Sequence, residues 1–243
     1  MKATWKNLMS RFLYHQVPPK LQVIPEVSQH LEHVAILAPH VKTYSTECEK
    51  LFQEKKVFFD NMVFEGTPLP EDEYIEMINT YRPELYVLPD KKDDPVATWE
   101  LHKHAIGKLK SLDGAMAVAQ GIPSEEYLTW VKEAGIKIIA VPYLDNYNRY
   151  AIIKFIQYVA PLHVHLLGIE HPSELYLYNN DHAILAADTT LAYTSAALGH
   201  LLEQGQYGKF KISDGTTERQ AIKEEGLVDR LVKNIQYIKS INW

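Results

Sequence analysis

The sequence predicts an α/β protein built as a single (β/α)8 (TIM) barrel, and three observations support this fold class. Short apolar runs alternate with longer amphipathic stretches along most of the 243-residue chain, which is the pattern of a parallel sheet covered by helices. The runs are almost wholly apolar, as expected for strands that are buried on both faces. The chain length suits one barrel domain. An open, doubly wound sheet is the less favoured alternative.

Seven strands and eight helices follow in order along the chain. The strands are predicted at Val34 to Ala38, Val57 to Asp60, Leu85 to Pro89, Ala115 to Gln120, Ile136 to Val141, Leu162 to Gly168 and Ala183 to Asp188. The helices are predicted at about Tyr44 to Gln53, Glu71 to Thr80, Pro95 to Leu109, Ser124 to Ala134, Arg149 to Ala160, Ser173 to Tyr178, Thr190 to Gln204 and Glu218 to Ser240. Ser173 is the expected N-cap of its helix.

An eighth strand has a weaker signal and is placed at Lys209 to Ser213. Residues 1–30 are then an N-terminal extension, and residues 217–243 hold a C-terminal helix that completes the single domain. No internal repeat, low-complexity stretch or linker interrupts this organisation.

Composition limits the classes of function. The formal net charge is -6, with 46% hydrophobic and 23% charged residues, which is ordinary for a soluble globular domain. No segment approaches the roughly 20 apolar residues of a membrane helix, and the N-terminus lacks the apolar core of a signal peptide. We therefore expect a cytoplasmic protein. Neither GxGxxG nor GxxxxGK(S/T) occurs, which disfavours a nucleotide cofactor.

The metal-binding residue types are poorly arranged for a metal site. The single cysteine, Cys48, excludes an internal disulfide and a cysteine-cluster zinc site. It lies in a predicted helix and is expected to be buried. The eleven histidines show no HExxH spacing, since His163 and His165 alternate along one predicted strand. We therefore expect no metal.

Polar side chains close four of the predicted strands. These residues are Asp60 at the end of VFFD, Asp90 at the end of LYVLPD, Asp188 at the end of AILAAD, and Gln120 at the end of the strand in GAMAVAQG. In a barrel these side chains meet at the carboxyl-terminal mouth, where active sites lie. For Asp188 alone, capping of the helix that begins near Thr190 is an equal alternative. The recurrence of aspartate after apolar strands favours a shared functional site.

A cluster of this kind suits glycosyl transfer. One carboxylate can attack an anomeric carbon and form a covalent glycosyl intermediate, while a second carboxyl group carries the proton. A further aspartate and a glutamine can bind the edge of a purine, because carboxylate oxygens accept from N–H groups and a carboxamide both donates and accepts. These residues alone leave a base-exchanging enzyme and a sugar hydrolase both open.

Between about Phe58 and Thr190 the motifs resemble those of the tRNA-guanine transglycosylase superfamily. They look most like its small branch from phages and bacterial genomic islands, which acts on DNA. The matching segments are DNMVFEG, LYVLPD, AVAQG, IIAVPYL, HLLGIEHPSEL and AADTT. The resemblance implies a barrel-shaped pentosyltransferase that exchanges guanine for a queuosine-related 7-deazaguanine, such as 7-cyano-7-deazaguanine. A phage-encoded member would act in the host cytoplasm.

The resemblance also implies a role for individual residues. Asp188 would be the nucleophile and Asp60 the general acid/base, and Asp90 and Gln120 would bind the guanine-like edge. Further substrate-binding positions are Gly121, Val141, Pro142 and Gly168, with Phe64 or Tyr143 stacking on the base.

The chain departs from the pattern of the tRNA enzymes in three places. Asn61 follows Asp60 where their motif is D-S-G-G-F/Y-Q, and no arginine follows Asp188 where they carry P-T-R. One cysteine cannot form their zinc subdomain, which uses three cysteines and a histidine. These differences favour DNA over tRNA as the substrate.

The implied partners are DNA, with tRNA as the alternative, and a free 7-deazaguanine base as co-substrate without any other cofactor. A homodimer and helper proteins stay open, as do a non-catalytic partner subunit of a transglycosylase and an unrelated barrel hydrolase or lyase. Basic residues near the two termini are candidates for holding phosphates. They are Lys2, Lys6, Arg11, Lys20, Lys209, Lys211, Arg219, Lys223, Arg230, Lys233 and Lys239.

Overall fold

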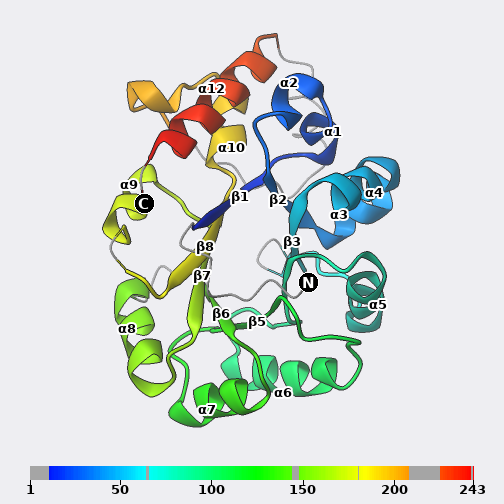
Figure 1. Ribbon diagram of the computed structural model, residues 1–243, viewed down its shortest axis with the longest axis vertical. Helices are drawn as coiled ribbons and strands as arrows, with labels where there is room; N and C mark the ends of the chain where they lie inside the picture. Colours follow the sequence, from blue (N-terminus) through cyan, green and yellow to red (C-terminus); the bar gives the residue numbers. More distant parts are fainter. Residues whose placement is uncertain (1–10, 64–65, 144–147, 180, 208–224, 242) are drawn as a thin grey trace, which may run out of the picture.

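The computed structural model describes residues 11–63, 66–143, 148–179, 181–207, 225–241 and 243. Within them, eight parallel strands form a closed barrel in which each strand pairs with its neighbours in chain order, and the first pairs with the last (Figure 1). The predicted (β/α)8 fold is thereby confirmed. The strands are β1 (Phe12–Gln16), β2 (His33–Leu37), β3 (Lys56–Asp60), β4 (Leu85–Val87), β5 (Ala115–Val118), β6 (Ile138–Pro142), β7 (His163–Leu167) and β8 (Ile184–Thr189).

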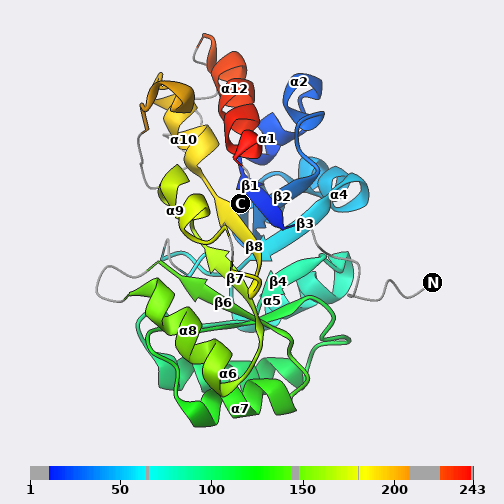
Figure 2. The ribbon, with the colours of Figure 1, turned by 60° about the vertical axis from the view of Figure 1, so that its left-hand side comes forward.

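Helices surround the barrel on its outer side (Figures 1 and 2). They are α1 (Pro19–Gln22), α2 (Pro25–Ser28), α3 (Ala38–Thr43), α4 (Ser45–Glu54), α5 (Glu71–Tyr81), α6 (Pro95–Ile106), α7 (Glu125–Glu133), α8 (Arg149–Val159), α9 (Pro172–Leu177), α10 (Leu191–Ala197), the 3-10 helix η2 (Leu202–Gln204) and α12 (Leu227–Ser240). The last helix packs against α10 and α2, so both ends of the described chain meet on one side of the barrel (Figure 2).

The position of the eighth strand is the main correction to the sequence prediction. Phe12–Gln16, within the expected N-terminal extension, forms β1 and pairs with both β2 and β8. The barrel closes through this strand, and the predicted strand at Lys209 to Ser213 lies outside the described residues. The sequence signal for this strand is weak because the segment carries the polar residues His15 and Gln16, yet both are buried, at 3% and 7% exposure.

Several helix ends also differ from the prediction. His171, not Ser173, is the N-cap of α9, and it forms a capping box with Glu174 while Pro172 occupies the first helical position. The helix α10 ends at Ala197 because Gly199 adopts a φ of 78°, which terminates a helix in the left-handed conformation. The helix α12 begins after Gly226; the predicted residues 218–224 lie outside the described part.

Apolar strand residues form one continuous core with the inner faces of the helices. Cys48 is fully buried in α4, as expected, and burial raises the pKa of its thiol to about 12. Inside the barrel, the rings of Tyr14, Phe58 and His165 lie against one another, with 4.7 Å between the centroids of the last two. This layer of rings fills the barrel interior below the polar residues at the carboxyl-terminal ends of the strands.

Candidate functional site

A cavity opens at the carboxyl-terminal ends of the strands. Its lining includes Asp60, Asp90, Gln120 and Asp188, the four strand-end residues, and every strand except β2 contributes to it. Its volume of about 140 Å³ far exceeds the ~10–15 Å³ that holds one water molecule. The cavity therefore has room for part of an organic ligand.

Asp188 ends the apolar run of β8, and its carboxylate is held at one oxygen. The Oδ1 atom accepts hydrogen bonds from His165 Nε2 at 3.0 Å and from the backbone N–H of Gly168 at 3.2 Å. Among the described residues, no hydrogen bond reaches Oδ2. The side chain does not cap α10, because the N–H of Leu191 donates to Thr189 Oγ1 instead. One oxygen is thus anchored, and the other is left for a ligand in the cavity.

His165 orients this carboxylate from inside the barrel. Its side chain is fully buried, and the strand pairing of β7 with β8 shifts register between Val164 and His165. Because Nε2 contacts a carboxylate oxygen, this nitrogen is the donor. In the described structure Nδ1 is buried without a hydrogen-bond partner. A ring packed this tightly fixes the direction from which it donates to Asp188.

Asp90 lies between two amide side chains. Asn61 Nδ2 donates to Asp90 Oδ1 at 2.5 Å, and Gln120 Nε2 donates to Oδ2. The amide oxygens are held in turn by the backbone N–H groups of Val63 and Asp93. Burial raises the pKa of the Asp90 carboxyl group, and the two amide hydrogen bonds partly oppose this effect. A carboxylate has about four acceptor positions, so the group keeps capacity for a ligand.

The chain turns sharply after Asp60. Asp60 Oδ1 accepts from the backbone N–H of Met62 at 2.6 Å, and Met62 has a φ of 65°. A non-glycine residue in this left-handed region costs about 1–3 kcal/mol, so the turn is held by its surroundings. Its effect is to place Asp60 on the cavity wall and to direct Asn61 towards Asp90.

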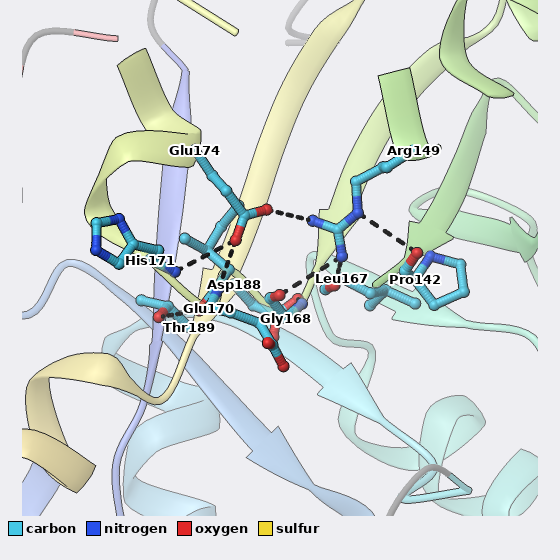
Figure 3. A network of polar contacts seen from close by, with 10 residues as sticks. Pro142, Arg149, Leu167, Gly168, Glu170, His171, Glu174, Asp188 and Thr189 are labelled. Carbon is cyan, nitrogen blue, oxygen red and sulfur yellow. Dashed lines mark hydrogen bonds and ion pairs between the residues drawn. The ribbon is translucent and has the colours of Figure 1, made fainter. Parts of the chain in front are cut away.

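Arg149 connects the carboxyl-terminal ends of β6 and β7 (Figure 3). Its guanidinium donates to the carbonyl oxygens of Leu167 and Pro142 and forms an ion pair of 3.2 Å with Glu174. Burial lowers the pKa of Arg149, and Glu174 opposes this effect. The group fixes the turn at Gly168, whose φ of 68° favours glycine and whose N–H holds Asp188.

We expect Arg149→Met to lower the free energy of unfolding by about 3 kcal/mol, because it leaves Glu174 without its cation in a largely buried setting. Urea denaturation measures the change. Lys154→Met is the matched control on the same helix: its ion pair with Asp181 is also short, at 2.7 Å, but the lysine side chain is 49% exposed. The control should lose less than about 1 kcal/mol, and equal losses in both variants would contradict the assigned role of Arg149.

The other predicted substrate-binding residues are distributed unevenly. Pro142, Tyr143 and Gly168 line the cavity, with Tyr143 37% exposed at its edge. Val141 is fully buried in β6 and does not line the cavity, and Gly121 lies in an adjoining depression bounded by Asp93, Pro95, Gln120 and Ile122. Phe64 lies outside the described residues.

Three residues of the site were not identified from the sequence as ligand or positioning groups. Asn61 and His165 contact Asp90 and Asp188, as described above. Gln16, at the end of β1, lines the cavity, and its Nε2 atom is buried without a partner in the described structure. Their positions in the sequence could have identified two of them, because Asn61 follows a strand-end aspartate and Gln16 is the last residue of a strand.

The basic residues near the termini do not gather at this mouth as far as they are described. Arg11 and Lys239 line a different cavity, at the amino-terminal ends of the strands. Arg230 donates to the backbone oxygens of Ala196 and Glu225. Arg11 and Lys239 therefore lie away from the carboxyl-terminal mouth, and the contact of the basic termini with phosphates stays a prediction. Lys2, Lys6, Lys209, Lys211, Arg219 and Lys223 lie outside the described residues.

Two further features are absent from the described part of the chain. No group of three or more histidine, cysteine, aspartate or glutamate side chains is arranged to hold a metal ion there. No helix among the same residues combines the length and apolarity that crossing a membrane requires.

Comparisons with known proteins support the fold and leave the chemistry open. No protein-family model and no curated protein sequence matches the chain. Among solved structures it resembles that of KGPDC from Streptococcus mutans, with a TM-score of 0.51 and 10% sequence identity, over 95% of this chain and 99% of that one. A likeness at this identity concerns the barrel alone.

Proposed function

We propose that the chain is a DNA base-exchange glycosyltransferase that replaces guanine with a 7-deazaguanine through a covalent glycosyl-aspartate. One observation carries the proposal: a single cavity contains Asp188, held at one oxygen, and Asp90, held between two amide donors. The first arrangement suits nucleophilic attack, and the second suits the binding of a purine edge.

In the first half-reaction, Asp188 Oδ2 attacks C1′ of a deoxyguanosine. The C1′–N9 bond breaks, and its electrons leave with guanine, which takes a proton from Asp60. In the second half-reaction, the ring nitrogen of the 7-deazaguanine attacks C1′, the bond to Asp188 breaks, and Asp60 recovers a proton from the incoming nitrogen. Anchoring of Oδ1 by His165 and Gly168 supports this role, because it limits rotation of the carboxylate.

Selection of the base falls to the Asp90 group. Guanine presents two adjacent N–H donors along its Watson–Crick edge, and a carboxylate can accept from both. Asn61 and Gln120 fix the plane of the Asp90 carboxylate before the base arrives. Tyr143 lines the cavity and is 37% exposed, and we propose that a base stacks on its ring.

The polymer must present its nucleotide outside a duplex, because C1′ of a stacked nucleotide does not reach a cavity inside a barrel mouth. The target is therefore flipped out or lies in a single strand. DNA is proposed over tRNA on the departures from the tRNA enzymes at Asn61 and after Asp188.

The test is incubation of the purified full chain with guanine-containing DNA and 7-cyano-7-deazaguanine, followed by nuclease digestion and mass spectrometry of the nucleosides. Bulk tRNA is treated in parallel. The expected product is a 7-deazaguanine deoxynucleoside from the DNA. Product from tRNA alone would refute DNA as the polymer, guanine release without incorporation would indicate a hydrolase, and absence of product from both would favour a non-catalytic subunit.

A further inference from the structure

A second cavity lies at the opposite end of the barrel from the candidate site. It is bounded by the amino-terminal ends of β1, β2 and β3 and by the last turn of α12, and we call it the amino-terminal cavity. Its volume is about 320 Å³, which exceeds the 140 Å³ of the carboxyl-terminal cavity. The proposed base exchange makes no use of it.

Positive charge dominates the lining of the amino-terminal cavity. Among its described residues, Arg11, Lys56 and Lys239 are cationic, and Glu32 supplies the one side-chain carboxylate. Glu32 pairs with Lys56 at 3.2 Å. Among the described residues, Lys239 donates to the backbone oxygen of His30, and Glu32 attracts it from nearby without forming an ion pair. Arg11 and Lys239 therefore face this cavity without an ion pair to a carboxylate among the described residues that line it.

Arg11 is also held mainly by neutral groups. Its guanidinium donates to the backbone oxygens of Tyr178 and Asp181, at 2.8 and 2.9 Å. The carboxylate of Asp181 attracts Arg11 from nearby, but it is already paired with Lys154 at 2.7 Å. Carbonyl groups orient the guanidinium and do not neutralise its charge.

Two histidines respond to this charge. Burial, followed by Lys239 and His33, lowers the pKa of His15 to about 3. Burial and then Lys56 lower the pKa of His33 to about 4; Glu32 opposes this effect and Lys239 adds to it. Both rings are thus neutral at pH 7. Nδ1 of His15 and Nε2 of His33 are buried without partners in the described structure.

We propose that the amino-terminal cavity binds a small phosphate-bearing anion. A phosphate group carries up to two negative charges and accepts several hydrogen bonds, which matches a cavity whose described lining holds three cations and one side-chain carboxylate. The three cations line one cavity, between strand ends and the last turn of α12, which favours a small ligand over the backbone of a nucleic acid. Binding would add negative charge beside His15 and His33 and would therefore raise both pKa values.

The experiment is an NMR titration of the histidine ring signals of the full chain with inorganic phosphate at pH 7, with ionic strength held constant by chloride. Saturable shifts of the His15 and His33 signals are expected. Lys239→Gln should weaken the phosphate affinity about tenfold. Lys233→Gln is the matched control, because Lys233 is exposed on the same helix and does not line the cavity.

A sugar phosphate and a DNA oligonucleotide form the other arms of the titration. Tighter binding of the sugar phosphate would identify a phosphate ester, and equal binding would identify free phosphate; both support the proposal. Shifts with the oligonucleotide alone would overturn it, as would the absence of saturable shifts or an equal weakening in the two lysine variants. None of these outcomes depends on base exchange at the other end of the barrel.

Discussion

Asp188→Asn is expected to abolish base exchange, with a loss on the order of 10⁴-fold or more. The amide is a far weaker nucleophile than the carboxylate, and its NH₂ group would face the His165 Nε2 donor, the Gly168 N–H or the cavity. The measurement is single-turnover release of labelled guanine from DNA. Trapping of the protein–DNA adduct on a denaturing gel reports the covalent step directly, and the variant should form no adduct.

Asp113→Asn is the control for this change. Asp113 is exposed and precedes β5 at the other end of the barrel, so the same chemical change there should leave exchange intact. Thermal unfolding of both variants separates loss of chemistry from loss of fold. Exchange by Asp188→Asn at the wild-type rate would refute the role of Asp188 as nucleophile.

The fold was predictable because its signals are local and repeated. Apolar runs such as Ile138–Pro142 are buried on both sides, and their alternation with amphipathic helices leaves few arrangements. The strand β1 carried a weaker signal, because Tyr14 and Gln16 face inwards with a polar group each and His15 lies between them. Closure of the barrel required a strand there, which only the pairing with β8 reveals.

The site was predictable where a residue ends a strand, and not where it depends on contacts between strands. Asp60, Asp90, Gln120 and Asp188 reach one cavity because parallel strands share their carboxyl-terminal edge. The contact of His165 with Asp188 depends on the register of β7 against β8, including its irregularity at Val164. The pairing of Asn61 with Asp90 depends on the left-handed Met62 turn. Neither feature leaves a periodic pattern in the sequence.

Replacement of Asp90 is expected to remove discrimination between bases more than it lowers the rate. In Asp90→Ala, the ratio of kcat/KM for guanine over hypoxanthine, which lacks the exocyclic amine, should fall by about 10²-fold or more. The reason is that the variant loses the acceptors for the two guanine donors. The loss also leaves the amides of Asn61 and Gln120 without their acceptor, which should cost about 1–3 kcal/mol of stability. Competition between the two bases in one reaction measures the ratio.

The acidity of Asp90 gives this prediction a second, independent readout. Because burial raises its pKa, the carboxylate should be protonated at a higher pH than an ordinary aspartate, whose pKa is about 3.9. A protonated carboxyl group cannot accept from both guanine donors, so wild-type discrimination should decline as the pH falls through the raised pKa. Stability depends on pH in the opposite direction from discrimination. Burial favours the neutral form of Asp90, so the carboxyl group stabilises the fold at low pH, and this contribution is lost as the pH rises through the raised pKa.

Asp93→Asn is the matched control for both readouts. Asp93 lies three residues further along the loop, is exposed, and contributes its backbone N–H rather than its side chain to Gln120. Asparagine also tolerates the left-handed backbone at this position, where φ is 58°. Base discrimination in this variant should keep both its size and its decline at low pH. Unchanged discrimination in Asp90→Ala, or the same decline of discrimination with pH in that variant, would contradict the role of Asp90. Base recognition would then belong to other residues that line the cavity.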